Sequence, residues 1–341
     1  MKFLGGLTIY KIIYVMILKV ILLLILYILK LTKYLKKQEY FIGIYKSFET
    51  PDVALFLKNK TKFYYMRRLK YLLSLNKRYN ESNLITFQDK LNYLMIHESP
   101  EYKSNIVDKI KLSEYSKKIL GKDICIPILK IYNNVEEINI NELPEQFVLK
   151  CNHGSSMNIF CKDKKNFDIN SAKKKLYNWM NSNYGFKGKE FQYYFVKRRI
   201  FASPYLGKLI DYKTFCFNGK PKFIAARVIL NLDKHSFIYN YYDVNWTLTD
   251  IEYGSKFYRR DTNIIIEKPK NLDLMLIYAE KLSKEFVFVR VDFYETNGKL
   301  YLGELTFSPS NNNMPYKNQK QRVYLGNLLD ITKINPSLFN N

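Results

Sequence analysis

The spacing of apolar positions divides the chain into an N-terminal part that predicts helices and a longer part in which helices and strands mix. Residues 52–80, 84–97 and 106–120 repeat apolar side chains at helical spacing, and Gly121 follows the third of these segments. From Phe147 onward, short apolar runs are bounded by turn residues, which is typical of strands. The pattern as a whole indicates an α+β fold with antiparallel sheet.

Two hairpins are predicted by turn residues that tolerate a left-handed backbone. Asn218-Gly219 follows a strand expected at 212–217, and Thr296-Asn297-Gly298 follows one expected at 287–294. The returning strands are expected at 223–228 and 300–305. The remaining elements expected here are strands at 147–150, 200–202 and 237–242, and helices at 171–184 and 272–284.

Residues 12–31 form an almost wholly apolar segment, interrupted by Lys19 and ended by Lys30. A run of about 20 residues suits the hydrocarbon core of a bilayer, and no small-residue cleavage site follows, so we expect a retained anchor. More lysines follow the segment than precede it. This bias places the C-terminal bulk of the chain in the cytoplasm, at the inner face of the membrane. A basic amphipathic helix lying on that membrane is the alternative.

Composition and charge narrow the class of partner. Hydrophobic residues make up 47% of the chain, which excludes intrinsic disorder for most of it. Lys and Arg number 55 against 31 Asp and Glu, a net charge of +24 that favours an anionic partner. No block of like charges forms a nucleic-acid-binding tail.

The chain has four cysteines and three histidines, and no two of the cysteines form a C-x-x-C pair. This pattern argues against a zinc site and against a disulfide framework.

The second predicted hairpin carries the most informative side chains. Asp292 and Glu304 lie on its two neighbouring strands, and strand alternation puts Arg290, Asp292 and Tyr294 on one face. Two facing carboxylates cost stability unless a cation lies between them. Oxygen ligands of this kind suit Mg²⁺, which also borrows phosphate oxygens.

A second pattern suits phosphate. Lys150 ends a strand and is followed by the loop Gly154-Ser155-Ser156, so a positive charge and backbone N–H donors come close together. Each feature also has a plain alternative. Lys150 can be a surface strand end, the loop an ordinary turn, and the two hairpin carboxylates solvated or paired with Arg290, while His153 can serve a local hydrogen bond.

Several motifs between about Leu84 and Pro309 follow one another in a specific order. They are Ile85-Thr86-Phe87-Gln88-Asp89-Lys90-Leu91, Asp108-Lys109, Phe147–Ser155, Asp211–Gly219, Tyr242–Trp246 and Phe288–Phe307. In order and length they resemble the TupA-like ATP-grasp family, which is associated with bacterial surface polysaccharide and teichuronopeptide synthesis. Arg290-Val291-Asp292 and Glu304, together with Lys150 and the Gly-Ser-Ser loop, are more distantly similar to D-alanine–D-alanine ligases.

The resemblance implies an ATP-grasp fold, in which two α+β lobes with antiparallel sheets hold ATP between them. Here the fold would be preceded by helices and an N-terminal membrane helix. The domains expected are an anchor at 1–37, a helical region at 38–100, an ATP-grasp domain at 101–325 and a tail at 326–341. Within the ATP-grasp domain, the small lobe would cover about 101–203 and the large lobe about 204–325.

The resemblance also implies a role for particular residues. Lys150 would contact the phosphates of ATP, and Gly154, Ser155 and Ser156 would cover them as a mobile loop. Asp292 and Glu304 would hold Mg²⁺, Arg290 would stabilise the charged intermediate, and Lys213 would contact phosphate or substrate. The reaction implied is phosphorylation of a carboxylate to an acyl phosphate, followed by attack of an amine.

The chain departs from the family pattern at four positions. Ser203-Pro204 stands at a hinge that is usually acidic, and Ser113 stands where a basic residue is usual. Thr306 replaces a metal-binding Asn of broader ATP-grasp enzymes, and Ser310 replaces the Gly of a Pro-Gly pair.

The expected function is therefore an ATP- and Mg²⁺-dependent carboxylate–amine ligase of capsular or cell-surface polysaccharide biosynthesis. Its partners would be an acidic polysaccharide or lipid-linked glycan precursor, an amino acid or other amine, and an anionic membrane surface, but no nucleic acid. The alternative is a catalytically weak ATP-grasp or glycosyltransferase-associated protein that binds glycan or partner proteins in the same pathway.

Overall fold

The computed structural model describes residues 79–185, 190–207, 209–231, 236–252, 258–312 and 316–338, all of which belong to the compact unit Tyr64–Asn341. The membrane segment predicted at 12–31 and nearly all of the helix predicted at 52–80 lie outside the described residues. Within the described ranges, no helix combines the length and apolarity that a bilayer crossing needs.

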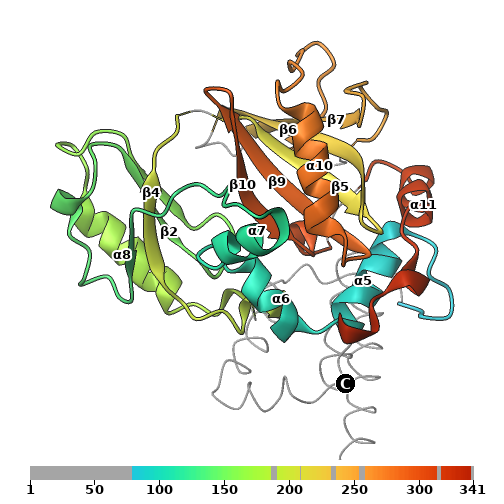
Figure 1. The fold of residues 1–341 in the computed structure, drawn as a ribbon, viewed down its shortest axis with the longest axis horizontal. Coiled ribbons are helices and arrows are strands. Elements are labelled where there is room, and N and C mark those ends of the chain that lie inside the picture. Colours follow the sequence, from blue (N-terminus) through green and yellow to red (C-terminus); the bar gives the residue numbers. More distant parts are fainter. Residues whose placement is uncertain are drawn as a thin grey trace, which may run out of the picture. The chain divides into compact units, whose positions relative to one another are not determined.

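A four-stranded sheet forms the first lobe, in the order β1-β4-β2-β3 (Figure 1). Its strands are β1 (Lys130–Tyr132), β2 (Phe147–Cys151), β3 (Asn158–Cys161) and β4 (Ile200–Pro204). One face carries Phe147 and Leu149, which pack with Leu176 of α8 (Ile169–Met180) in a buried apolar cluster. Alternation therefore turns Val148 and Lys150 to the opposite face.

A six-stranded sheet forms the second lobe, in the order β10-β9-β5-β6-β7-β8. Its strands are β5 (Asp211–Phe217), β6 (Lys220–Asn231), β7 (Ser236–Asp243), β8 (Tyr258–Arg259), β9 (Phe288–Thr296) and β10 (Lys299–Thr306). All pairs except β7–β8 are antiparallel. The two predicted hairpins are confirmed, since Asn218, Gly219, Asn297 and Gly298 all have positive φ.

The two faces of the large sheet have different covers. On one face, Tyr212, Cys216 and Val291 pack in a single cluster with Met275 and Leu282 of α10 (Leu272–Ser283). On the other face, an aromatic cluster of Phe215, Phe217, Phe223 and Phe288 packs against Phe87 and Leu91 of α5 (Phe87–His97) and Leu325 of α11 (Gln319–Asn327). The part of this face that the aromatic cluster leaves uncovered carries polar side chains. This polar part forms one wall of the candidate site.

The prediction of one helix over 106–120 is wrong. The structure has α6 (Pro100–Val107) and α7 (Leu112–Leu120) instead. Asp108 ends α6 in an extended conformation, and its Oδ1 accepts a hydrogen bond from the N–H of Ile110 at 2.9 Å. An Asp side chain that bonds nearby backbone competes with helix in this way. The break leaves Lys109 in a turn, where its side chain reaches the lobe interface.

The helix predicted at 171–184 also differs from the structure, since α8 ends at Met180.

A β-bulge in β10 decides which way Glu304 points. Leu302 pairs with Phe293, but Glu304 pairs with Asp292, so Gly303 is the extra residue. Without the bulge, Glu304 would lie opposite Val291 and face the core. A Cβ on Gly303 would lie 2.4 Å from Cε2 of Tyr294, so only glycine fits here without displacing that ring.

Candidate active site

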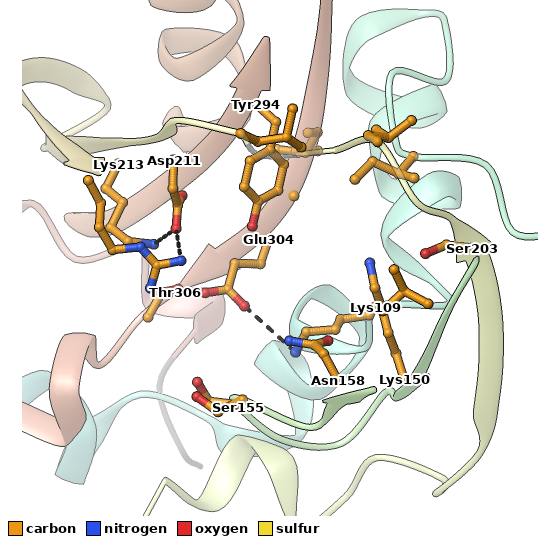
Figure 2. A pocket seen from close by; sticks show the side chains of 18 of the residues that line it. Lys109, Lys150, Ser155, Asn158, Ser203, Asp211, Lys213, Tyr294, Glu304 and Thr306 are labelled. Atoms are coloured by element: carbon orange, nitrogen blue, oxygen red, sulfur yellow. Dashed lines mark hydrogen bonds and ion pairs between the residues drawn. The ribbon is translucent and has the colours of Figure 1, made fainter. Parts of the chain in front are cut away.

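A cavity of about 1120 Å³ lies between the pocket faces of the two sheets. The small sheet contributes Lys150, Phe201 and Ser203, and the large sheet contributes Arg290 and Glu304. Figure 2 shows Lys109 directed toward Glu304 of the second lobe, with Lys150 of the first lobe on the same side of the opening as Lys109. Cations and a carboxylate therefore face each other across one opening.

Lys109 connects the two lobes. Its Nζ donates a hydrogen bond to the carbonyl of Gly154 at 2.6 Å and lies 3.6 Å from Oε2 of Glu304. The neighbouring Asp108 is buried, and its Oδ1 accepts a hydrogen bond from Nδ2 of Asn152 at 2.8 Å. This contact ties the Asp108-Lys109 turn to the strand end before the Gly-Ser-Ser loop. Lys109 was part of a sequence motif without an assigned role.

The Gly154-Ser155-Ser156 loop borders the cavity at the same end. A Cβ on Gly154 would lie 2.9 Å from atoms of Met157 and Tyr184, so the loop packs closely there because Gly has no side chain. Ser155 and Ser156 are exposed and line the cavity, and Ser156 has a φ of 60°. Their hydroxyl and N–H groups can meet a ligand, as the sequence indicated.

Lys150 has a perturbed ionisation. Burial lowers the pKa of its ammonium from 10.5 to about 8, the charge of Lys109 acts in the same direction, and Glu304 opposes both. Two cations that approach each other in a partly buried place favour an anion between them. Lys150 and Lys109 together therefore form a candidate phosphate site.

A pH dependence follows from the lowered pKa of Lys150. An ammonium with a pKa of about 8 is about 90% charged at pH 7 and about 10% at pH 9. We expect nucleotide affinity to fall about tenfold over that range, measured by calorimetry in matched ionic strength. Lys150→Arg stays charged and should flatten the profile. A wild-type profile as flat as that of the arginine variant would contradict this prediction.

The large lobe holds a dense ion-pair cluster around Asp292. Nε and Nη2 of Arg290 donate to the two Asp292 oxygens at 2.6 Å each, and Nζ of Lys213 lies 2.5 Å from Oδ2. Lys213 also lies 2.8 Å from Oδ2 of Asp211. Burial opposes the charge on Lys213, but the two carboxylates outweigh it and raise its pKa. Lys213 is 6% exposed, so its ammonium serves these carboxylates in this arrangement.

Glu304 is the more accessible of the two hairpin carboxylates. Its side chain is 24% exposed, whereas that of Asp292 is 1% exposed. Burial acts against its charge, but Lys109, Lys213 and Arg290 together lower the pKa of Glu304 to about 2. Nη2 of Arg290 donates to Oε1 of Glu304 at 3.2 Å and to Oγ1 of Thr306 at 3.1 Å. Glu304 is therefore ionised at neutral pH and open to the cavity.

The two carboxylates differ as ligands for Mg²⁺. Both oxygens of Asp292 accept hydrogen bonds from Arg290, and Lys213 binds one of them as well. In the part of the chain that the structure describes, no three His, Cys, Asp or Glu side chains gather in a way that could hold a metal ion. Glu304 alone fits a magnesium ion that takes its other ligands from phosphate and water.

Two orphaned polar atoms, one on each sheet, show that the cavity fits a polar ligand. Oγ of Ser203 and Oδ1 of Asp211 are buried, line the cavity and have no hydrogen-bond partner among the described residues. Buried polar atoms without partners are uncommon and call for a ligand or water. Asp211 was part of a sequence motif without an assigned role, although its position two residues before Lys213 puts both on one strand face.

Two further buried side chains near the cavity make local hydrogen bonds. His153 bonds the carbonyl of Trp179 at 3.0 Å, and burial lowers its pKa to about 4, so it is neutral and has the local role that the sequence allowed. Glu190 was not anticipated. It is buried beside the cavity, where its Oε1 accepts a hydrogen bond from Oγ of Ser308 at 2.7 Å. No simple sequence signal marks Glu190, because it follows residues without a strand or helix pattern.

Comparison with solved structures gives neighbours of low identity. The D-alanine–D-alanine ligase of Bacillus anthracis complexed with ATP is 16% identical over 67% of this chain and 66% of its own, with a TM-score of 0.39. The D-alanyl-alanine synthetase A of Vibrio cholerae is 13% identical over 71% and 72%, with a TM-score of 0.39. The N5-carboxyaminoimidazole synthetase of Staphylococcus aureus complexed with ADP is 12% identical over 70% and 54%, with a TM-score of 0.40.

The chain thus spans just under two thirds of the Bacillus anthracis enzyme and about half of the Staphylococcus aureus one. No curated protein sequence matches it. The sequence model of the family described as TupA-like ATPgrasp, however, matches residues 89–330, which include both sheets and every residue of the site above. The resemblance drawn from the motifs is confirmed, and the chain belongs to the TupA-like ATP-grasp family.

Proposed function

We propose that this protein is an ATP-dependent carboxylate–amine ligase that amidates an acidic glycan or its lipid-linked precursor in capsular or cell-surface polysaccharide biosynthesis. One observation carries the ligase part of the proposal. Lys109, in the turn between α6 and α7, and Lys150 of the small lobe face Glu304 of the large lobe across one cavity, with 3.6 Å between Lys109 Nζ and Glu304 Oε2. The lysines can bind the negative phosphates of a triphosphate, and the carboxylate can bind the cation that accompanies it.

The proposed reaction has two steps. A carboxylate oxygen of the glycan attacks the γ-phosphorus of ATP, an acyl phosphate forms and ADP leaves. The amine nitrogen then attacks the acyl carbon, the C–N bond forms, and phosphate leaves while the nitrogen loses a proton. Neither step needs a nucleophile from the protein, so the residues contribute position and charge.

The residues divide these tasks by location. Lys109 and Lys150 would bind the β- and γ-phosphates, and Ser155 and Ser156 would close over them. Arg290 lines the cavity, and its hydrogen bond to Asp292 holds the guanidinium in place. The guanidinium can therefore stabilise negative charge on the transferred phosphoryl group. A magnesium ion held by Glu304 would neutralise phosphate charge.

The charge of the chain supports the glycan part of the proposal. A net charge of +24 attracts a polyanion and an anionic membrane surface. The apolar segment at 12–31 would hold the enzyme beside membrane-bound intermediates at the inner face of the cytoplasmic membrane. The amine partner would be an amino acid or another small amine.

The test is ADP release by the full-length protein in detergent, with ATP, Mg²⁺, a uronic-acid oligosaccharide and hydroxylamine as the amine probe. We expect ADP release that needs the oligosaccharide, together with a hydroxamate product, because hydroxylamine traps an acyl phosphate. Glu304→Gln should abolish both signals, because Glu304 is the carboxylate proposed to hold the magnesium ion. Mg²⁺-dependent ADP release that survives Glu304→Gln, or that is indifferent to the carboxylate substrate, would contradict the proposal.

One observation favours a second candidate function. Both Asp292 oxygens are already bound by side chains, and Thr306 stands beside Glu304, so the site offers few free metal ligands. A protein that keeps the scaffold with weak catalysis, and binds glycan or partner proteins, would have such a site. Calorimetric titration with MgATP separates the two, since micromolar binding of the nucleotide counts against a purely scaffolding role.

A further inference from the structure

Glu190 is a buried carboxylate on the wall of the cavity, outside the residues that would bind the nucleotide. It is 6% exposed. Its Oε1 accepts a hydrogen bond from Oγ of Ser308 at 2.7 Å, and its Oε2 accepts one from the hydroxyl of Tyr184 at 3.2 Å. Nε2 of Gln192 donates to the same Ser308 hydroxyl at 2.9 Å. Such bonds favour the ionised form of a carboxylate, and a hydroxyl does not cancel its charge.

Strand register shows where this carboxylate lies relative to the hinge. Asp211, where the chain enters the large lobe, pairs with Tyr294 of β9. Tyr294 pairs with Tyr301 of β10, and Glu304 and Ser308 follow Tyr301 in that order along the chain. The carboxylate that Ser308 contacts therefore lies on the opposite side of Glu304 from the hinge. A nucleotide whose phosphates reach a cation at Glu304 leaves this end of the cavity to the substrates.

A pair of tyrosines shows that Glu190 and Glu304 act on the same place. Tyr184 and Tyr193 pack edge to face, with 5.2 Å between their ring centres. Burial raises the pKa of both phenols, and the charges of Glu190 and Glu304 raise each of them further. Nζ of Lys109 lies 5.8 Å from the centre of the Tyr193 ring. Glu190 is therefore within electrostatic reach of the groups that surround the proposed phosphate site.

The second step of the proposed reaction needs a proton acceptor. An alkylamine is an ammonium ion at pH 7, and its nitrogen has no lone pair for attack until it loses a proton. Glu304 is paired with Lys109 and Arg290, and two cations of the large lobe hold Asp211. Glu190 lies at the substrate end of the cavity and offers an ammonium ion both an opposite charge and a base.

We infer that Glu190 receives the attacking amine, and that its carboxylate binds the ammonium ion and takes one proton from it. The neutral nitrogen then attacks the acyl carbon, the C–N bond forms, and the C–O bond to phosphate breaks. The second proton of the nitrogen leaves with the phosphate, and Glu190 returns its own to water as the product departs. The inference rests on the proposed ligase reaction and adds the residue that handles its amine.

The experiment lets two amines compete for one acyl phosphate. The full-length protein in detergent receives ATP, Mg²⁺, a uronic-acid oligosaccharide and a mixture of methylamine and hydroxylamine at pH 7, and mass spectrometry gives the ratio of N-methylamide to hydroxamate. Methylamine is protonated at this pH, whereas hydroxylamine is mostly neutral and needs no base. Glu190→Gln should lower the ratio about 100-fold, the effect of losing a general base. Glu136→Gln removes the same charge from an exposed turn and should leave the ratio unchanged.

The ratio separates catalysis from structure. Both products come from the same intermediate, so a defect in folding or in ATP use lowers them together. A ratio in Glu190→Gln within about threefold of the wild-type value overturns the inference and leaves the ligase proposal standing. A wild type that forms only the hydroxamate has the same meaning. If the wild type forms neither product, the proposed function fails and the inference fails with it.

The wild type decides the question where Glu190→Gln makes no product. Its KM for methylamine should be at least about tenfold below its KM for O-methylhydroxylamine, which has a similar size but is neutral, because a carboxylate binds a charged donor more strongly. Equal KM values for the two amines overturn the inference.

Discussion

We expect Asp292→Ala to lower the free energy of unfolding by about 3–5 kcal/mol, because it leaves buried cations uncompensated. Arg290 loses two hydrogen bonds of 2.6 Å, and Lys213 loses its contact of 2.5 Å. Lys213 keeps Asp211 and Arg290 keeps Glu304, so the cluster is weakened without being dissolved. Urea denaturation followed by tryptophan fluorescence measures the change.

The matched control is Glu280→Gln. Glu280 also pairs with a lysine, Lys220, but both side chains are about half exposed. Exposed pairs of this kind contribute about 0–1 kcal/mol. An Asp292→Ala variant that loses no more stability than this control would show that the cluster around Asp292 does not support the fold.

The second large effect is expected on ligand binding. Lys150→Met should weaken MgATP binding by about 10- to 150-fold, since a hydrogen bond to a charged group contributes about 1.5–3 kcal/mol. Methionine keeps most of the volume of the lysine stem, which lies beside Phe201. Calorimetry at pH 7 measures the change, because most Lys150 side chains are charged there.

Lys174→Met removes the same charge from an exposed position on α8. It should change MgATP affinity by less than about twofold, because a solvated charge outside the cavity is screened by salt. Equal effects of the two substitutions would mean that Lys150 acts only through net charge, and would remove it from the phosphate site.

Much of the architecture could be predicted from local pattern. The Asn218-Gly219 and Asn297-Gly298 turns require positive φ, and the structure has it at all four residues. Arg290 and Asp292 were placed on one strand face by alternation, and their hydrogen bonds confirm it. Such features depend on neighbours in the sequence, and for that reason the sequence reveals them.

Other features of the site depend on contacts between distant segments. The break at Asp108 could not be predicted from the apolar spacing of 106–120, because Asp108 is fixed there by Asn152, 44 positions away. Lys213 was expected at phosphate, but its ammonium is held by Asp211 and Asp292. The pairing of β5 with β9 creates that contact. The spacing of apolar residues within one segment does not show which distant strand that segment pairs with.

The sequence by itself determined the family, the α+β class, the hairpin turns and the residue types that could meet a triphosphate. Only the tertiary structure decided which of them are free to do so. The bulge at Gly303 turns Glu304 into the cavity, while Arg290 and Lys213 enclose Asp292. The physical reason is that a side chain's chemistry follows from its residue type, but its charge, its exposure and its partners follow from segments that only folding brings together.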